Sequence, residues 1–448
     1  MKKSILYVVC TTCCLLLSAQ QYPFIRYEAN TIHYDSTSPT MQHFLDKWHK
    51  VHSRGEGRLS IIHIGGSHVQ AGTFPHRVRT RILSDNPTLV GGRGLLFPYS
   101  AAAKCNNPAD YKVHCLQKVK LTRNVYKHLE TPLGLCGIAV TAFDNPTRIQ
   151  IVNNEMAVNY ASSHIVVLGY SPEGVVPMLS YGGRDVQPSY IDSATHRYVF
   201  NLAREVDSFD ILLPCSVGQT FTLTGVTLGN RRPGITYHSI GVNGASVVDY
   251  LKCDYLTDDL RLLHPDLVVF GIGINDAVPK DFDTVAFRRN YLSLCDTIRS
   301  VNPHCAFIFI TNNDSYRRTG RRRYAVNRNG LLAREVFYRL AVETGGAVWD
   351  QFEIMGGLKS MEKWQQAGLA QRDKVHFTRA GYLLIGDMFY EAFSRMIGNG
   401  GTAGTVAPPT PPKESNRKTN HATIQPPASN DDNIIETQEN DRFPYLPQ

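Results

Sequence analysis

Beyond its N-terminal segment, the 448-residue sequence contains no apolar run long enough to cross a bilayer. It also contains no Cys-x-x-Cys pair after residue 20, so a structural zinc site has little support, and we expect neither a metal nor a cofactor. What it does contain is typical of globular proteins: 42% hydrophobic and 19% charged residues, with a modest net charge of +8. We therefore expect a soluble mature protein with no stable membrane insertion.

The first 20 residues follow the pattern of a signal peptide. Two lysines, Lys2 and Lys3, precede an apolar stretch over residues 5–17, and Ser18-Ala19-Gln20 then provides a cleavage site. This pattern predicts export to the periplasm or the cell surface, where nucleic acid is not an expected partner. A buried N-terminal helix is the alternative interpretation.

Seven cysteines remain after this segment, and an odd number leaves at least one thiol free. They are Cys105, Cys115, Cys136, Cys215, Cys253, Cys295 and Cys305. Some can pair in an exported protein, and Cys105 and Cys115 are the closest in sequence. Spacing alone does not give the connectivity.

Positive charge is concentrated in one short stretch of five arginines. They are Arg317, Arg318, Arg321, Arg322 and Arg323. Charge runs of this kind are usually solvated loops. The alternative is contact with an anionic polymer such as a cell-wall glycan or lipopolysaccharide.

From about residue 399 the composition changes to proline, threonine, serine, asparagine and charged residues. Such a segment cannot bury enough apolar surface to order itself. We therefore predict that residues 399–448 form a linker or a disordered extension without a catalytic role.

Residues 233–398 alternate apolar strand-like runs with longer amphipathic stretches, which is the pattern of parallel β-α-β units. The predicted strands are 234–238, 267–272, 306–311 and 346–349, and the predicted helices are 245–263, 282–300, 331–343 and 379–397. A first strand is missing from this block. Residues 59–64 provide it, so this domain begins upstream, within residues 21–99.

The segment between these two parts, residues 100–232, has a different pattern of apolar and turn residues. Short β-type runs at 148–152, 164–168 and 220–224 lie between turn residues, which is typical of an antiparallel sandwich. An all-β module is therefore predicted to interrupt an α/β domain between its first and second strands.

Four short segments each follow a predicted strand and would meet at the carboxyl edge of one parallel sheet, where such sheets bind their ligands. They are Gly65-Gly66-Ser67, Asn243-Gly244, Asn275-Asp276, and Asp373 with His376. Each has an ordinary structural explanation when taken alone. A strand-to-helix turn, a turn dipeptide, a helix cap and a surface ion pair would explain them in that order.

Together they provide what a serine esterase needs. Ser67 is the candidate nucleophile, His376 the base that takes its proton, and Asp373 the acid that orients the imidazole. The oxyanion of the tetrahedral intermediate needs preorganised donors. The backbone N–H groups of Ser67 and Gly244 and the side-chain amide of Asn275 are the three candidates.

This set resembles the conserved blocks of the SGNH, or GDSL-type, hydrolase superfamily, over about residues 55–97 and 234–397. The resemblance implies a flavodoxin-like three-layer α/β/α sandwich and a metal-independent esterase, lipase or deacetylase. The details of the first two blocks and the β insert look like the peptidoglycan O-acetylesterase branch, in which the insert is similar to a carbohydrate-binding module. The implied partner is an acetylated glycan of the cell wall or of another source.

One residue departs from the family pattern: Gly66 stands where an aspartate is usual. That aspartate is not a triad member, so we expect activity to survive, although the support of the nucleophile loop changes. A lipase, thioesterase or acyltransferase with the same triad is the enzymatic alternative. A non-catalytic glycan-binding protein is the alternative from another class, because fold does not determine function.

Overall fold

The computed structural model describes residues 22–102, 105–155, 157–321 and 323–398. The predicted signal peptide at residues 1–20 and the predicted extension at residues 399–448 lie outside them. Of the helices in these ranges, none combines the length and the apolar character that a membrane span requires.

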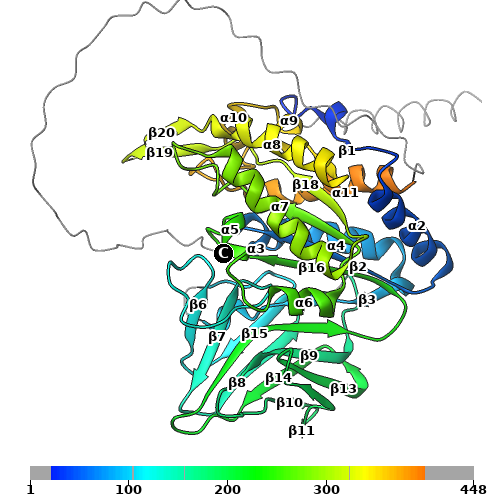
Figure 1. Ribbon diagram of the computed structural model, residues 1–448, viewed down its shortest axis with the longest axis vertical. Helices are drawn as coiled ribbons and strands as arrows, with labels where there is room; N and C mark the ends of the chain where they lie inside the picture. Colours follow the sequence, from blue (N-terminus) through cyan, green and yellow to red (C-terminus); the bar gives the residue numbers. More distant parts are fainter. Residues whose placement is uncertain (1–21, 103–104, 156, 322, 399–448) are drawn as a thin grey trace, which may run out of the picture. The chain divides into compact units, whose positions relative to one another are not determined.

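A mainly parallel sheet forms the centre of the α/β part, in the order β1-β21-β18-β17-β2-β16-β3 (Figure 1). The five strands β16, β2, β17, β18 and β21, numbered by their order in the chain, are arranged 2-1-3-4-5, which is the flavodoxin-like order. The strand order reverses between β2 and β17, and this is the topological switch point. Only the edge strand β1 is antiparallel to its neighbour. The bounds are β1 Ile32–Tyr34, β2 Arg58–Gly65, β3 Val90–Gly92, β16 Gly234–Gly241, β17 Leu267–Gly271, β18 Ala306–Ile310 and β21 Ala347–Trp349.

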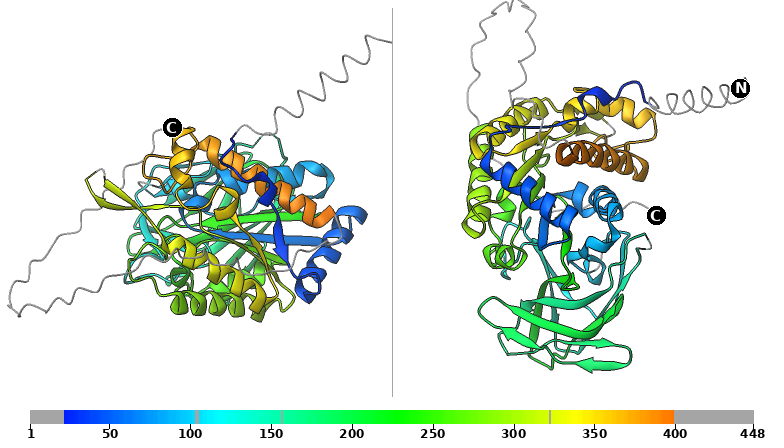
Figure 2. Two further views of the ribbon diagram at one scale, coloured as in Figure 1. Left: turned by 90° about the horizontal axis from the view of Figure 1, so that it is seen from above. Right: turned by 90° about the vertical axis from the view of Figure 1, so that its right-hand side faces the viewer.

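Successive side chains of each strand point to opposite faces, and the two faces pack in two separate hydrophobic clusters. In β2, for example, Ile62 and Ile64 join one cluster, whereas Leu59 and Ile61 join the other. Helices therefore cover both faces (Figure 2). One layer is α2 Pro39–Arg54, α4 Thr73–Asp85 and α11 Arg379–Gly398, and the other is α6 Leu256–Leu263, α7 Thr284–Val301 and α8 Asn329–Thr344.

Short helical turns complete this part. They are η1 Tyr27–Ala29, α3 Ser67–Gln70, η2 Pro87–Leu89, η3 Tyr99–Ala101, α5 Val247–Tyr250, α9 Gln351–Ile354 and α10 Ser360–Gln366. The helix α11 starts where the sequence predicts, because the Thr378 hydroxyl accepts a hydrogen bond from the Gly381 N–H at 3.2 Å.

Between β4 and β16 the chain forms two antiparallel sheets, ordered β11-β10-β14-β8-β5 and β12-β13-β9-β15-β7-β6. The short strand β4 of the preceding segment pairs with β15. One face of the central sheet and the insert share a single core cluster. The bounds are β4 Gly94–Leu96, β5 Tyr111–Cys115, β6 Lys120–Arg123, β7 Ile138–Phe143, β8 Thr147–Asn153, β9 Ser162–Tyr170, β10 Met178–Tyr181, β11 Arg184–Val186, β12 Tyr190–Asp192, β13 Arg197–Val206, β14 Ser208–Leu213 and β15 Thr220–Gly229.

The predicted α/β class with an inserted β-rich region is therefore confirmed, but two local predictions are wrong. The single helix expected over residues 245–263 is broken into α5 and α6, because the Tyr255 N–H donates to the carbonyl of Leu133 in the insert at 2.9 Å. The arginine stretch is a hairpin instead of a loop, formed by β19 Tyr316–Gly320 and β20 Arg323–Val326.

The seven cysteines of the described residues are all free thiols, so the pairing considered for Cys105 and Cys115 is not formed. Five of the seven are buried. Burial raises the pKa of the Cys253 thiol to about 12, which keeps it protonated and unreactive.

Candidate active site

Two distant segments bring a serine, a histidine and an aspartate together at the carboxyl edge of the central sheet. The Ser67 Oγ lies 2.8 Å from the His376 Nε2, and the His376 Nδ1 lies 2.7 Å from an oxygen of Asp373. These are the contacts that a Ser-His-Asp relay requires. The imidazole remains 35% exposed, so a ligand can reach it from solvent.

A row of three glycines lets the Ser67 turn close over this edge. Gly65, Gly241 and Gly271 end β2, β16 and β17 and are in register with one another. A Cβ on Gly65 would lie 2.2 Å from the side chain of Val69, and one on Gly241 would lie 2.4 Å from the Gln70 nitrogen. Larger residues would push the turn, and with it the Ser67 hydroxyl, away from the sheet.

The turn that carries Asp373 and His376 is fixed by its own backbone. One oxygen of Asp373 accepts the N–H groups of Val375 and His376, each at 3.0 Å, and Lys374 adopts a left-handed conformation with φ of +56°. Burial would raise the pKa of the Asp373 carboxyl, but the hydrogen bond and charge of His376, with these two donors, hold it below its ordinary value. Asp373 therefore stays ionised beside the imidazole.

Three hydrogen-bond donors lie in the turns that follow β2, β16 and β17, whose ends are in register at the edge that carries Ser67. In the described residues, the N–H groups of Ser67 and Gly244 have no protein acceptor. The Asn275 Nδ2 donates one hydrogen to the Ala245 carbonyl at 2.9 Å, which leaves its second hydrogen free. Gly244 has a φ of +85°, a conformation that a side chain would strain. The arrangement suits a developing oxyanion.

Residues 216–384 match the model of the GDSL-like Lipase/Acylhydrolase family. The chain has a GDSL-type hydrolase domain. The predicted class, a serine hydrolase that acts on ester bonds, is confirmed by this match. Gly244, Asn275, Asp373 and His376 lie inside the matched range, whereas Ser67 lies outside it because the β insert separates the first strand from the others.

The fold of this chain is similar to that of one solved structure, and two others give weaker matches. A peptidoglycan O-acetylesterase structure is 20% identical, with a TM-score of 0.67 over 82% of this chain and 99% of its own. An acetyl xylan esterase, AlAXEase, is 18% identical (TM-score 0.29, 35% of this chain and 81% of its own). The acetylxylan esterase Axe2 from Geobacillus stearothermophilus, as a catalytic mutant, is 24% identical (TM-score 0.28, 37% and 73%). No curated protein matches this chain.

Replacement of Asn275 by alanine is expected to lower kcat for p-nitrophenyl acetate on the order of 10²- to 10³-fold, because one oxyanion donor of the GDSL-type domain is lost. KM should change little, and loss of the bond to the Ala245 carbonyl should lower the melting temperature modestly. A purely structural Asn275 would lower the melting temperature to the same extent but leave kcat within a few-fold of the parent value.

The position of Gly66 shows how the nucleophile turn of this GDSL-type domain is held without the usual aspartate. A Cβ on Gly66 would lie 3.3 Å from the Asn275 Nδ2 and 3.5 Å from the Ala245 carbonyl oxygen. The direct hydrogen bond between Asn275 and Ala245 occupies this space. On the other side of the turn, the Tyr250 hydroxyl donates to the Gly65 carbonyl at 2.8 Å.

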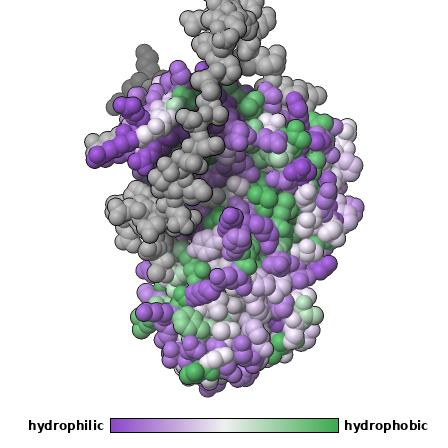
Figure 3. All heavy atoms as spheres, turned by 60° about the vertical axis from the view of Figure 1, so that its left-hand side comes forward, coloured by the Kyte–Doolittle hydropathy of each residue, from purple (hydrophilic) through white to green (hydrophobic). Residues whose placement is uncertain are grey.

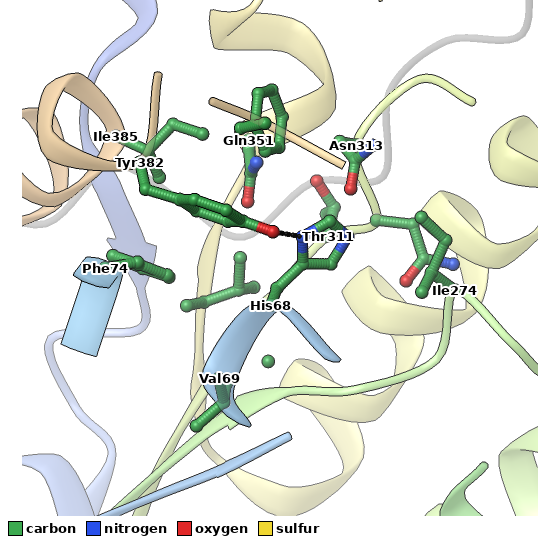
Figure 4. Close-up of a pocket in the computed structure, with 13 residues that line it drawn as sticks. His68, Val69, Phe74, Ile274, Thr311, Asn313, Gln351, Tyr382 and Ile385 are labelled. Atoms are coloured by element: carbon green, nitrogen blue, oxygen red, sulfur yellow. Dashed lines mark hydrogen bonds between the residues drawn. The ribbon is translucent and has the colours of Figure 1, made fainter. Parts of the chain in front are cut away.

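His68 packs against the catalytic turn. Its ring centre lies 5.3 Å from that of His376, and its Nδ1 lies 2.8 Å from the Tyr382 hydroxyl (Figure 4). Burial, helped by the charge of His376, lowers the pKa of His68 to about 3, so this ring stays neutral. Behind it lies a small cavity whose polar lining includes Thr311, Asn313 and Gln351.

Further residues that support the site had no clear signal in the sequence. The Gln70 side chain accepts the Asn243 N–H at 2.7 Å, and Arg123 of the insert donates to the Asn243 carbonyl. The Asn313 amide donates to the Val375 carbonyl at 3.1 Å. Gln70 is three residues from Ser67, and this short spacing could have indicated a role in the site. Arg123 could not, because it lies 120 residues from Asn243 in a different part of the fold.

Asp276, next to Asn275 in the sequence, contacts the start of α5. Both of its oxygens lie 3.2–3.3 Å from the Val247 N–H at the start of α5, so this carboxyl caps a helix of another segment. Burial raises its pKa to about 7. The described residues contain no cluster of three or more His, Cys, Asp or Glu side chains that could hold a metal ion.

Proposed function

We propose that this chain is an exported serine esterase that removes O-acetyl groups from a cell-wall or other glycan. The observation that carries the proposal is the pair of contacts at 2.8 Å and 2.7 Å that join Ser67, His376 and Asp373. The signal-peptide pattern of residues 1–20 supports export.

In the proposed first step, the Ser67 oxygen attacks the acetyl carbonyl and His376 takes its proton. The Asp373 carboxylate stabilises the imidazolium, and the N–H groups of Ser67 and Gly244 with the Asn275 amide bind the oxyanion. The C–O bond to the sugar then breaks, and His376 returns the proton to the sugar oxygen. Water, activated by the same imidazole, attacks acetyl-Ser67 and releases acetate.

Two features favour an acetylated glycan as the substrate. The triad is open to solvent. An acetyl group on a polymer requires an open site, because the glycan chain must pass across it. The fold is similar, over 82% of this chain, to that of a peptidoglycan O-acetylesterase. The α/β parts make up little more than half of the chain, so this likeness extends into the β insert, next to the site.

The test is a profile of acetate release by the purified protein from O-acetylated peptidoglycan, acetylated xylan and O-acetylated sialic acid. We expect release from at least one of them by the wild-type protein and none by Ser67→Ala. Absence of release from all three would overturn the glycan assignment.

The family match alone also fits an esterase or lipase for longer acyl chains. A series of p-nitrophenyl esters from acetate to palmitate separates the two, because a site built for acetyl groups excludes long chains sterically. A protein that binds glycans but hydrolyses none of these esters would instead be a non-catalytic binding protein.

A further inference from the structure

We propose that the arginine hairpin, residues 316–321 and 323–326, binds carboxylate groups of a glycan whose acetyl ester lies at Ser67. This inference names the substrate class of the proposed esterase and so rests on the proposed function. Arg318, Arg321 and Arg323 are exposed on the hairpin, and Arg317 is half-buried beside them. Not one of these four guanidinium groups forms an ion pair with a carboxylate of the described residues.

The charges of the hairpin repel one another without compensation. Arg323 of β20 faces Gly320 of β19, and Arg318 lies two residues before Gly320 on β19. Arg318 faces Tyr324, so neither arginine has a carboxylate opposite it. A two-stranded hairpin is itself only marginally stable in water. A ligand with negative charge would remove this repulsion and gain bidentate contacts, because a guanidinium matches the geometry of a carboxylate.

The base of the hairpin is attached to two loops of the catalytic site. The Tyr316 N–H donates to the Lys374 carbonyl at 3.1 Å, within the turn that carries Asp373 and His376. Directly after β20, the Asn327 side-chain amide donates to the Ala277 carbonyl at 3.0 Å, and Ala277 lies two residues after Asn275. The Lys374 ammonium also lies 4.7 Å from the ring centre of Tyr316. A ligand on the hairpin is therefore held in a fixed relation to the triad.

The length of the hairpin favours a polymer over a small anion. The strand β19 has five residues and spans about 17 Å at the usual rise per residue. A ligand that reaches both the exposed arginines and Ser67 must therefore be an extended chain. Tyr324, opposite Arg318 and 37% exposed, offers an aromatic face to a sugar ring.

The hairpin projects from the left of the molecule in Figure 1. Figure 3 turns this side toward the viewer, and hydrophilic side chains gather at its upper left.

The test measures binding on the full-length Ser67→Ala protein, so that hydrolysis does not interfere. The probes are polygalacturonate and the same polymer fully methyl-esterified, which keeps the sugar chain and removes its charge. By titration calorimetry we expect the charged polymer to bind, the neutral one not to bind, and binding to weaken with added salt. Arg318→Gln/Arg321→Gln/Arg323→Gln should bind roughly tenfold more weakly and keep the parent melting temperature.

A matched variant controls for net charge. Arg184→Gln/Arg204→Gln/Arg289→Gln removes three exposed arginines on β11, β13 and α7, which are not part of the hairpin, and should bind like the parent. Equal affinity of the two triple variants, equal binding of both polymers, or no binding of polygalacturonate would overturn the proposal. Failure of the proposed function is distinct, because it would appear as ester hydrolysis that survives in Ser67→Ala.

Discussion

Ser67→Ala is expected to lower kcat for p-nitrophenyl acetate by about 10⁴- to 10⁶-fold, since the nucleophile and its base act as one unit. The alanine protein keeps the oxyanion donors and the binding surface, so a small residual rate over water remains. The Ser67 side chain has the His376 contact at 2.8 Å as its one hydrogen bond in the described residues, so its loss should not unfold the protein. The measurement is the initial rate of p-nitrophenol release with the melting temperature recorded alongside.

Two further variants make this result specific. Adding His376→Ala to Ser67→Ala should cause almost no further loss, because residues that act together are not additive. Ser293→Ala, on the exposed face of α7, should keep the wild-type rate. A Ser67→Ala protein with wild-type turnover would refute the assignment of the nucleophile, whatever the geometry at His376.

The parallel core of this protein could be predicted from the sequence because its signals are local. Runs such as Leu267-Val268-Val269-Phe270 predict strands that are buried on both faces, and each is followed within a few residues by glycine, asparagine or serine. Strand ends that carry these residues meet at one edge in any right-handed β-α-β arrangement. That topology places the turns of Ser67, Gly244 and Asn275 at one edge, after β2, β16 and β17. The prediction that Asp373 and His376 also follow a strand is wrong, because α9 and α10 lie between β21 and this turn.

Other features depend on contacts between distant segments and leave no local pattern. The break between α5 and α6 depends on the Leu133 carbonyl, which competes for the Tyr255 N–H from the insert. The support of Asn243 by Arg123 is of the same kind. The arginine stretch became a hairpin because its ends are fixed at Lys374 and Ala277, and its composition contains no trace of either partner.

Asp110→Asn is expected to lower the free energy of unfolding by about 3–5 kcal/mol, because it leaves two buried guanidinium groups uncompensated. One oxygen of Asp110 accepts from the Arg79 Nη2 at 2.7 Å and from the Arg93 Nε at 2.9 Å. The side chains of Arg79, Arg93 and Asp110 are 1%, 3% and 0% exposed. Arg79 belongs to α4 and Asp110 to the insert, so this cluster also joins the insert to the helix that follows the nucleophile turn.

The pH dependence of the same cluster has a definite sign. Burial would raise the pKa of Asp110, but the charges of Arg93 and Arg79 hold it well below its ordinary value. The unfolded chain therefore takes up the proton first, and the stabilisation is complete at neutral pH and is lost only as the pH falls through the acid range. The gap in urea midpoint between wild type and Asp110→Asn should stay constant from pH 8 to about pH 5.

A double-mutant cycle separates this charge cluster from ordinary packing. Arg93→Gln keeps a donor for the Leu95 carbonyl but removes one buried charge. In wild type it leaves Asp110 with less compensation, whereas in Asp110→Asn it removes a charge that has no partner, so it should cost clearly less in the second background. Glu130→Gln, at an exposed ion pair with Lys120, should leave the urea midpoint unchanged. If the costs of Asp110→Asn and Arg93→Gln simply add, the two side chains contribute independently and the cluster does not act as a charge network.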